Sequence, residues 1–157
     1  MKIALVSATW HSDLLEGALN ACDSVLSRAP YGALQADHFV VPGCLEIPLF
    51  AKRISESGNY SAVIAFGLIV NAGIYAHEFV AEAVISGMMR VQLDTGVPIL
   101  SCVLTPHEFS EAPERLAWFK DHLVIKGREV GTACVNLLTA MLDARLQPSH
   151  AVEVAAV

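Results

Sequence analysis

SAVIAFGLIVNAGIYAHEFVAEAVISGMMRVQLDTG, residues 61–96, is the stretch that decides the fold. It opens on an unbroken apolar run, 62–70, which is typical of a strand buried on both faces of a parallel sheet. Residues 71–73 interrupt the run, and from Ile74 the apolar residues recur at helical spacing until Gly96 ends the helix. The stretch therefore predicts a strand, a tight turn and a helix N-terminus.

The turn after this strand offers the chemistry of a ligand site. In α/β sheets, ligands bind in the crevice outside the carboxyl ends of the strands. A helix N-terminus at that place presents unpaired backbone N–H groups and a partial positive charge, both of which suit a phosphate. His77 lies in the first turn of the predicted helix, and an imidazole can accept or pass a proton near neutral pH.

The charge and the hydropathy exclude several classes of protein. The net charge is −6 and no Lys/Arg cluster exists, which argues against nucleic acid as a partner. Apolar residues make up 54% of the chain and charged residues 17%, yet the longest apolar run falls short of the roughly 20 residues that span a bilayer. The apolar surplus therefore predicts surface that is buried between subunits.

The cysteines and the N-terminus indicate a reducing compartment. Cys22, Cys44, Cys102 and Cys134 are widely spaced and form no CxxC pair, so we expect reduced thiols and neither a disulfide framework nor a metal site. The first residues enter a strand directly and lack the apolar core and cleavage site of a signal peptide. A cytoplasmic protein is the resulting expectation.

Strands and helices alternate along the rest of the chain. The further predicted strands are 2–7, 34–41 and 97–104, and the further predicted helices are 13–28, 48–57, 111–122 and 126–147. This order predicts one α/β domain over residues 1–157, with a parallel sheet, helices on both faces and a loose tail at 148–157. The strand at 34–41 alternates weakly, as an edge strand does. Asp13 and Glu16 predict a capping box at the first helix.

The helix after the central strand has more than one apolar side. Its apolar residues are Val80, Val84, Ile85, Met88, Met89 and Val91. A helix with two apolar sides needs two partners, so we expect self-association through it.

Four loops leave the carboxyl ends of the predicted strands with functional residues. Trp10 follows the first strand, the segment 42–46 follows the second, 71–77 follows the third and 105–115 follows the fourth. Because the carboxyl ends of parallel strands share one edge of a sheet, the topology alone brings these loops together.

These segments resemble the lumazine synthase family. The resemblance is carried by VPGCLEIP (41–48), NAGIYAHEFV (71–80), GVPILSCVLT (96–105) with the Glu-Arg that follows, and IKGREVG (125–131). It extends from about Lys2 to Leu146, and its details are similar to the type II, decameric subgroup. It implies a flavodoxin-like three-layer sandwich with a four-stranded parallel sheet.

The resemblance also implies an activity. The family condenses 5-amino-6-(D-ribitylamino)uracil with 3,4-dihydroxy-2-butanone 4-phosphate in the penultimate step of riboflavin biosynthesis. The reaction forms a Schiff base, eliminates phosphate and closes a ring, and it uses no metal and no redox cofactor. Active sites shared between adjacent subunits of a pentamer-based assembly, a decamer in this subgroup, are also implied.

The resemblance assigns roles to residues of this sequence. Trp10 matches the aromatic that stacks on the uracil ring. The remaining substrate-binding positions are Cys44, Leu45, Glu46, Leu68, Ile69, Val70 and Ser101. The positions that bind phosphate are Gly73, Ile74, Arg115 and Lys126, with Glu129 beside Lys126. Ser101, Arg115 and Lys126 would come from the neighbouring subunit, and the planar fork of an arginine suits a phosphate dianion.

The catalytic histidine departs from the family's register by one residue. Counted without gaps, the family position falls on Ala76, and His77 follows it. One step along a helix turns a side chain by about 100°. We assign the catalytic role to His77 because it is the imidazole at this helix start.

Each of these residues has a structural alternative. Trp10 could cap the core, His77 could bond a carbonyl, Glu46 could pair with a helix dipole and Arg115 could be a solvated charge. At the level of function, one alternative is a paralogue that binds riboflavin or lumazine with little or no turnover. Another is a phosphosugar-binding protein of flavodoxin-like fold.

Overall fold

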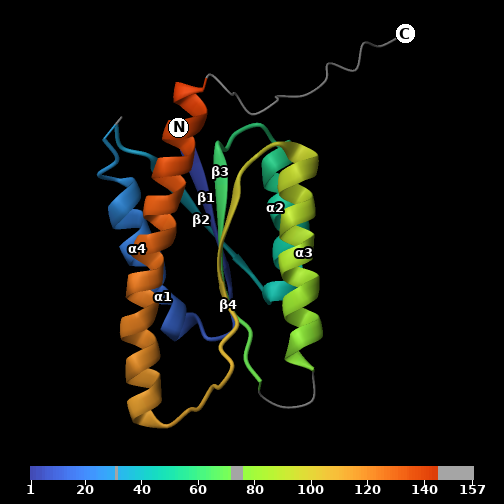
Figure 1. The fold of residues 1–157 in the computed structure, drawn as a ribbon, viewed down its shortest axis with the longest axis vertical. Coiled ribbons are helices and arrows are strands. Elements are labelled where there is room, and N and C mark those ends of the chain that lie inside the picture. The colour runs from blue at the N-terminus through green and yellow to red at the C-terminus, as the bar shows by residue number, and fades with distance from the viewer. Residues whose placement is uncertain (31, 72–75, 145–157) are drawn as a thin grey trace.

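A four-stranded parallel sheet forms the centre of the computed structural model, which describes residues 1–30, 32–71 and 76–144. The strand order is β2-β1-β3-β4. The strands are β1 (Lys2–Ala8), β2 (Gln35–Val41), β3 (Ala62–Leu68) and β4 (Ile99–Leu104). Their carboxyl ends all point to the lower end of the molecule in Figure 1. The predicted parallel sheet is confirmed.

The central strands are apolar because both of their faces are covered. Every residue of β3 is buried, and β3 pairs with β1 on one side and β4 on the other. Half-exposed β2 lies at the edge of the sheet, as its weak alternation predicts. Strand β4 forms the opposite edge.

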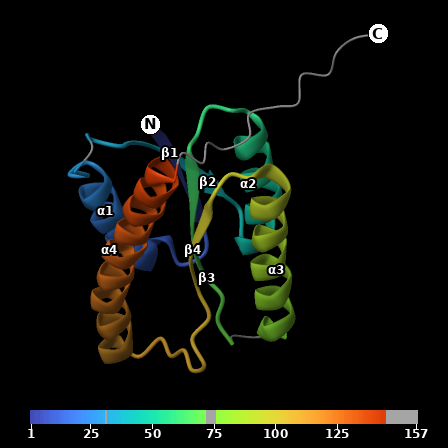
Figure 2. The ribbon, with the colours of Figure 1, turned by 45° about the horizontal axis from the view of Figure 1, so that its top comes forward.

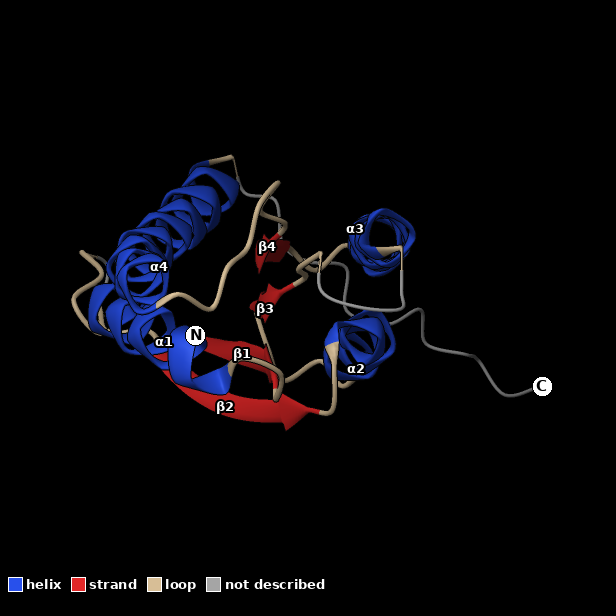
Figure 3. Ribbon diagram, turned by 90° about the horizontal axis from the view of Figure 1, so that it is seen from below, coloured by secondary structure: helices blue, strands red, loops and turns tan. Residues whose placement is uncertain are grey.

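Helices cover both faces of the sheet. Their bounds are α1 (Ser12–Leu26), α2 (Ile47–Glu56), α3 (His77–Thr95) and α4 (Pro113–Asp143), with a short 3-10 turn η1 (Cys44–Glu46) before α2. Figures 2 and 3 show α1 and α4 on one face and α2 and α3 on the other, which gives the predicted three layers of a flavodoxin-like α/β fold.

Helix α4 corrects the prediction of two separate C-terminal helices. One continuous helix of 31 residues replaces the predicted segments 111–122 and 126–147, of which residues 145–147 lie outside the described chain. The predicted break at 123–125 lies within the helix, where Leu123 is buried in the core, and the neighbouring Gly127 is buried against the backbone of Ala18 in α1. The glycine therefore serves a close approach between two helices and does not end one.

The start of α1 also differs from the prediction. The helix begins at Ser12, and its cap residue His11 makes no side-chain cap hydrogen bond, so the capping box of Asp13 and Glu16 is wrong. His11 itself has a left-handed backbone with φ of 60°. Its carbonyl accepts hydrogen bonds from the N–H groups of Leu14 and Leu15.

The core consists of two halves, one on each side of the sheet. The half under α1 and α4 is formed by large apolar side chains and three thiols: Leu5, Leu15, Cys22, Phe66, Cys102, Leu123 and Cys134. The half under α2 and α3 includes Val6, Ile47, Ala51, Val63, Val84 and Met88.

Helix α3 has the two apolar sides that the sequence predicts. Val84, Met88 and Val91 are buried against the sheet and α2. Phe79 and Leu93, on the other side, are each 74% exposed, and Ile85 and Met89 lie between them on the same stripe. Within the described residues, no helix is long and apolar enough to cross a membrane.

Candidate functional site

The four predicted loops leave the same edge of the sheet, and backbone hydrogen bonds tie neighbouring strand ends together. The N–H of Thr9 donates to the carbonyl of Val41 at 2.9 Å, which joins the ends of β1 and β2. The N–H of Ile69 donates to the carbonyl of Leu104 at 2.9 Å, which joins the ends of β3 and β4. The lower end of Figure 1 is therefore one continuous rim.

Trp10 presents its indole to solvent at this rim. The side chain of Thr9 donates a second hydrogen bond to Val41, at 3.0 Å, so the residue before the indole is held at two points. Trp10 itself is 68% exposed, which rules out the alternative that it caps the core. An exposed indole on an anchored backbone is a surface on which a flat heterocycle can stack.

The turn η1 places Cys44 against the central strand. Its sulfur occupies the space above Gly67 of β3 that the side chain of any larger residue would fill. Burial raises the pKa of the Cys44 thiol to about 11, while a hydrogen bond from the backbone of Leu68 acts in the opposite direction. The thiol is therefore neutral near pH 7, and it anchors η1 to β3.

Leu45 and Glu46 extend outward from the same turn. Leu45 is 57% exposed, and Glu46 is exposed with its Oε2 close above Gly43. The small Gly43 leaves room for this carboxylate to lie over the backbone. A carboxylate in that position can accept hydrogen bonds from hydroxyl groups.

At the end of β3, a ligand can reach the backbone, but two of the side chains are buried. Leu68 and Ile69 are buried on opposite sides of the sheet, and Val70 is half-buried. A ligand at the rim would therefore meet mainly peptide groups along this segment, which suits recognition of polar ring atoms.

His77 is the first residue of α3, and Ala76, in an extended conformation, is the cap residue. The imidazole side chain is only 16% exposed, and its Nδ1 lies 3.2 Å from Oε2 of Glu78. His77 thus occupies the helix start at which the sequence predicts a proton-transfer group. Gly73 and Ile74, the predicted phosphate turn, lie outside the described residues.

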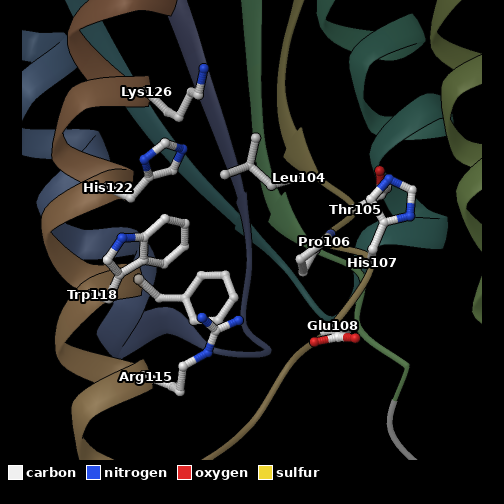
Figure 4. A pocket seen from close by; sticks show the side chains of 10 residues that line it. Leu104, Thr105, Pro106, His107, Glu108, Arg115, Trp118, His122 and Lys126 are labelled. Atoms are coloured by element: carbon white, nitrogen blue, oxygen red, sulfur yellow. The ribbon is translucent and has the colours of Figure 1, made fainter.

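A pocket of about 490 Å³ opens between α4 and the loop after β4 (Figure 4). Its lining residues are Leu104, Thr105, Pro106, His107, Glu108, Arg115, Trp118, Phe119, His122 and Lys126. Arg115, His122 and Lys126 come from one face of α4 and line the pocket at successive heights along the helix (Figure 4). The cationic Arg115 and Lys126 outnumber the one acidic residue of the lining, Glu108, so the pocket is suited to an anion.

The predicted pair of Lys126 and Glu129 is present. Nζ of Lys126 lies 2.7 Å from Oε2 of Glu129, one turn farther along α4. The carboxylate holds the ammonium group at the upper end of the pocket, where hydroxyl groups of a ligand could also be bound.

The sequence did not identify Trp118 and His122 as pocket residues. Their rings stack, with centroids 4.7 Å apart and an interplanar angle of 9°. The signal that could have found them is their spacing, because positions three, seven and eleven residues after Arg115 share one face of a helix.

Ser101 does not lie with either group of site residues in this chain. It sits in the middle of edge strand β4, it is exposed, and its Oγ accepts a hydrogen bond from the N–H of Val103 at 3.2 Å. The structure therefore shows two groups of residues: those of the rim, from Trp10 to His77, and those of the α4 pocket. Among residues 1–30, 32–71 and 76–144, no three His, Cys, Asp or Glu side chains gather in a way that could hold a metal ion.

Comparisons with known proteins agree on one family. Residues 1–141 match the family described as 6,7-dimethyl-8-ribityllumazine synthase. A protein of that name from Rhodococcus erythropolis is 47% identical over 132 residues, which are 84% of this chain and 85% of the relative. A 6,7-dimethyl-8-ribityllumazine synthase 2 from Bradyrhizobium diazoefficiens is 44% identical over 141 residues, 89% of this chain and 84% of the relative. A protein with the same name from Pseudomonas syringae pv. tomato is 38% identical over 144 residues, 92% of this chain and 85% of the relative.

Proposed function

The chain belongs to the 6,7-dimethyl-8-ribityllumazine synthase family, and we propose how its own residues carry out the reaction of that family. It is an enzyme of riboflavin biosynthesis that condenses 5-amino-6-(D-ribitylamino)uracil with 3,4-dihydroxy-2-butanone 4-phosphate. The observation that supports our assignment of the site is the rim with its exposed indole, together with a separate pocket that holds Arg115 and Lys126.

The rim binds the uracil substrate in this proposal. Trp10 stacks on the pyrimidine ring, and the backbone of residues 68–70 meets its polar atoms. Cys44 and Leu45 line the same side, and the Glu46 carboxylate accepts hydrogen bonds from the ribityl hydroxyls. The anchored positions of Thr9 and of η1 support this role, because a binding surface held in place loses little entropy when a ligand arrives.

The phosphate substrate is bound in this proposal by Gly73 and Ile74, which lie outside the described residues, together with Arg115 and Lys126 of the neighbouring subunit. Arg115 grips the phosphate with its planar fork. Ser101 faces the pyrimidine from the neighbouring subunit, where an exposed hydroxyl on an edge strand is free to contact it. Much of the rate would come from orienting two reactants in one site.

His77 moves a proton during the condensation. Its low exposure at the start of α3 and its contact with the Glu78 carboxylate support this role, because a carboxylate can orient an imidazole through one ring nitrogen and leave the other free. We assign the role to His77 because Ala76 carries no titratable group.

The complete site forms between two subunits of a pentamer-based homo-oligomer, which we propose is a decamer. The exposed apolar stripe of α3 supports an assembly, since a surface of this kind is buried in stable oligomers. All four cysteines are free thiols, which is consistent with our proposal of a cytoplasmic location.

A mixing experiment tests the shared site. Arg115→Ala and the double substitution Trp10→Ala with Glu46→Ala each inactivate a different half, so neither protein should form lumazine alone. Unfolded together and refolded at equal amounts, they should regain about a quarter of the parent activity, the share of interfaces that combine two intact halves. No regain would contradict a site shared between subunits.

The activity itself is tested by lumazine absorbance with both substrates. A parent protein that forms no lumazine at micromolar concentration but binds riboflavin tightly would instead be the non-catalytic paralogue. The named relatives favour the synthase over that alternative.

The variant His77→Ala distinguishes a role in proton transfer from a role in ligand binding. Turnover should fall, by roughly 10²-fold or more for a general acid–base group, while affinity for a flavin ligand should stay unchanged.

A further inference from the structure

We infer that Trp118 is a positioning residue, which holds the guanidinium of Arg115 in the pocket without neutralising its charge. The inference rests on the proposed role of Arg115 in phosphate binding. None of the sequence motifs points to Trp118; the geometry of α4 does.

The guanidinium of Arg115 lies against two aromatic rings. Its Cζ is 5.6 Å from the ring centroid of Trp118 and 5.8 Å from that of Phe119, both within the range of a cation–π contact. The two rings meet edge to face, with centroids 5.1 Å apart and an interplanar angle of 79°. They form a corner that limits where the guanidinium can move.

Other side chains hold this corner in place. His122 stacks on the outer face of Trp118 at 4.7 Å. Phe119 is 4% exposed, and Phe109, from the loop after β4, packs against it at 5.2 Å. Phe109 in turn contacts the ring of His11, next to Trp10, at 5.1 Å. The corner is therefore fixed from the core, from the next helical turn and from the loop.

The charge of Arg115 stays available to a ligand. Over the described ranges 1–30, 32–71 and 76–144, Arg115 forms no salt bridge and no side-chain hydrogen bond, whereas Lys126 is paired with Glu129. A carboxylate partner would fix the guanidinium but would also compete with phosphate for its N–H donors. An aromatic face attracts the cation and leaves every donor free.

Two substitutions of Trp118, by side chains of similar size, test whether its aromatic ring is required. Trp118→Phe keeps an aromatic face, and Trp118→Leu keeps only apolar contact. We expect Leu to raise the KM for the phosphate substrate roughly three- to fivefold, the range of a partly exposed cation–π contact. The Phe variant should stay near the parent, and the KM for the uracil substrate should not change in either. The inhibition constant of inorganic phosphate should follow the same order.

A double-mutant cycle distinguishes an effect of Trp118 that acts through Arg115 from a general disturbance of the structure. If Trp118 acts through Arg115, adding Trp118→Leu to Arg115→Ala should cause no further loss of affinity for inorganic phosphate, measured by direct binding. A multiplied effect in the double variant, or an equal loss for both substrates, would overturn the inference. Circular dichroism and the assembly size of each variant verify that it folds.

A parent protein without lumazine formation would contradict the proposed function. An active parent whose phosphate KM and phosphate inhibition are the same in Trp118→Leu would contradict the positioning role alone.

Discussion

The two faces of the sheet are covered in different ways. On the α1/α4 face, the helices approach each other through glycines: Gly127 lies on the backbone of Ala18, and Gly131 lies on Cys22 and Val25. On the α2/α3 face, α3 keeps a full apolar stripe in solvent, with Phe79 and Leu93 at 74% exposure. The contact between α1 and α4 is closed within one chain, and we call this the closed face; the apolar stripe of α3, the open face, has the character of a surface that a second copy completes.

The largest effect is expected at the closed face, from Gly127→Ala. An alanine in a helix is normally about 1 kcal/mol better than a glycine, but here its methyl group would collide with the Ala18 backbone. We expect the free energy of unfolding to fall by about 3 kcal/mol or more, measured by urea denaturation. The matched variant is Gly87→Ala on the other face, where the nearest atoms are the side chain of Pro48 at 3.0 Å, and it should change stability by less than about 1 kcal/mol.

The next effect tests the open face. Phe79→Glu places a charge on the apolar stripe and should weaken each subunit contact by about 2–3 kcal/mol. Sedimentation velocity should show smaller species at micromolar concentration, with unchanged circular dichroism. Leu142→Glu, a substitution of a half-exposed residue on α4, is the control and should leave the assembly size unchanged. An intact assembly in Phe79→Glu would contradict the comparison of the two faces.

The closed face should also respond to alkali. Cys22, Cys102 and Cys134 all lie on this face, and burial raises the pKa of Cys134 from 9.0 to about 12. Above pH 9 the unfolded chain loses the proton while the folded chain keeps it, so stability falls as pH rises. Between pH 8 and pH 10 one such thiol accounts for about 1.4 kcal/mol of that loss.

A variant without the Cys134 thiol tests this dependence of stability on pH. In Cys134→Ala, the difference in unfolding free energy between pH 8 and pH 10 should be smaller than in the parent by that amount. The absolute stability at pH 8 will fall because a buried side chain is truncated, but the pH difference is independent of that cost. An unchanged pH difference would show that the thiol is not protected from ionisation.

The smallest effect concerns α2. Ser55 is buried, and its hydroxyl has no hydrogen-bond partner within the described part of the chain. Ser55→Ala should therefore raise the free energy of unfolding by about 1 kcal/mol, seen as a higher urea midpoint. Between pH 8 and pH 10, the free energy of unfolding of Ser55→Ala should fall by as much as that of the parent, because a hydroxyl does not titrate in this range. A lower midpoint would indicate that the hydroxyl has a partner.

Much of the architecture follows from patterns in the sequence. The apolar run at 62–70, the weak alternation at 34–41 and the double-sided helix after Ile74 correspond to the central strand, the edge strand and the half-exposed α3. These features are visible in the sequence because burial on one or two faces has a fixed period. The rim is predictable for a similar reason, since parallel strands end at one edge.

The errors have a common physical cause. The break predicted at 123–125 does not form because Leu123 is buried in the core and Gly127 packs on Ala18, more than a hundred residues away in the chain. The contact of Cys44 with Gly67 and the corner of Trp118 and Phe119 are likewise long-range or geometric. Local periodicity carries no information about such contacts.

The glycine contact between α1 and α4 has a mechanical consequence. It lies near the middle of α4, and Arg115 projects about 18 Å beyond it along the helix axis. If a larger side chain at position 127 tilted α4 by about 5°, Arg115 would move by roughly 1.5 Å. The packing of two backbones at one glycine thus sets how accurately a distant guanidinium is placed.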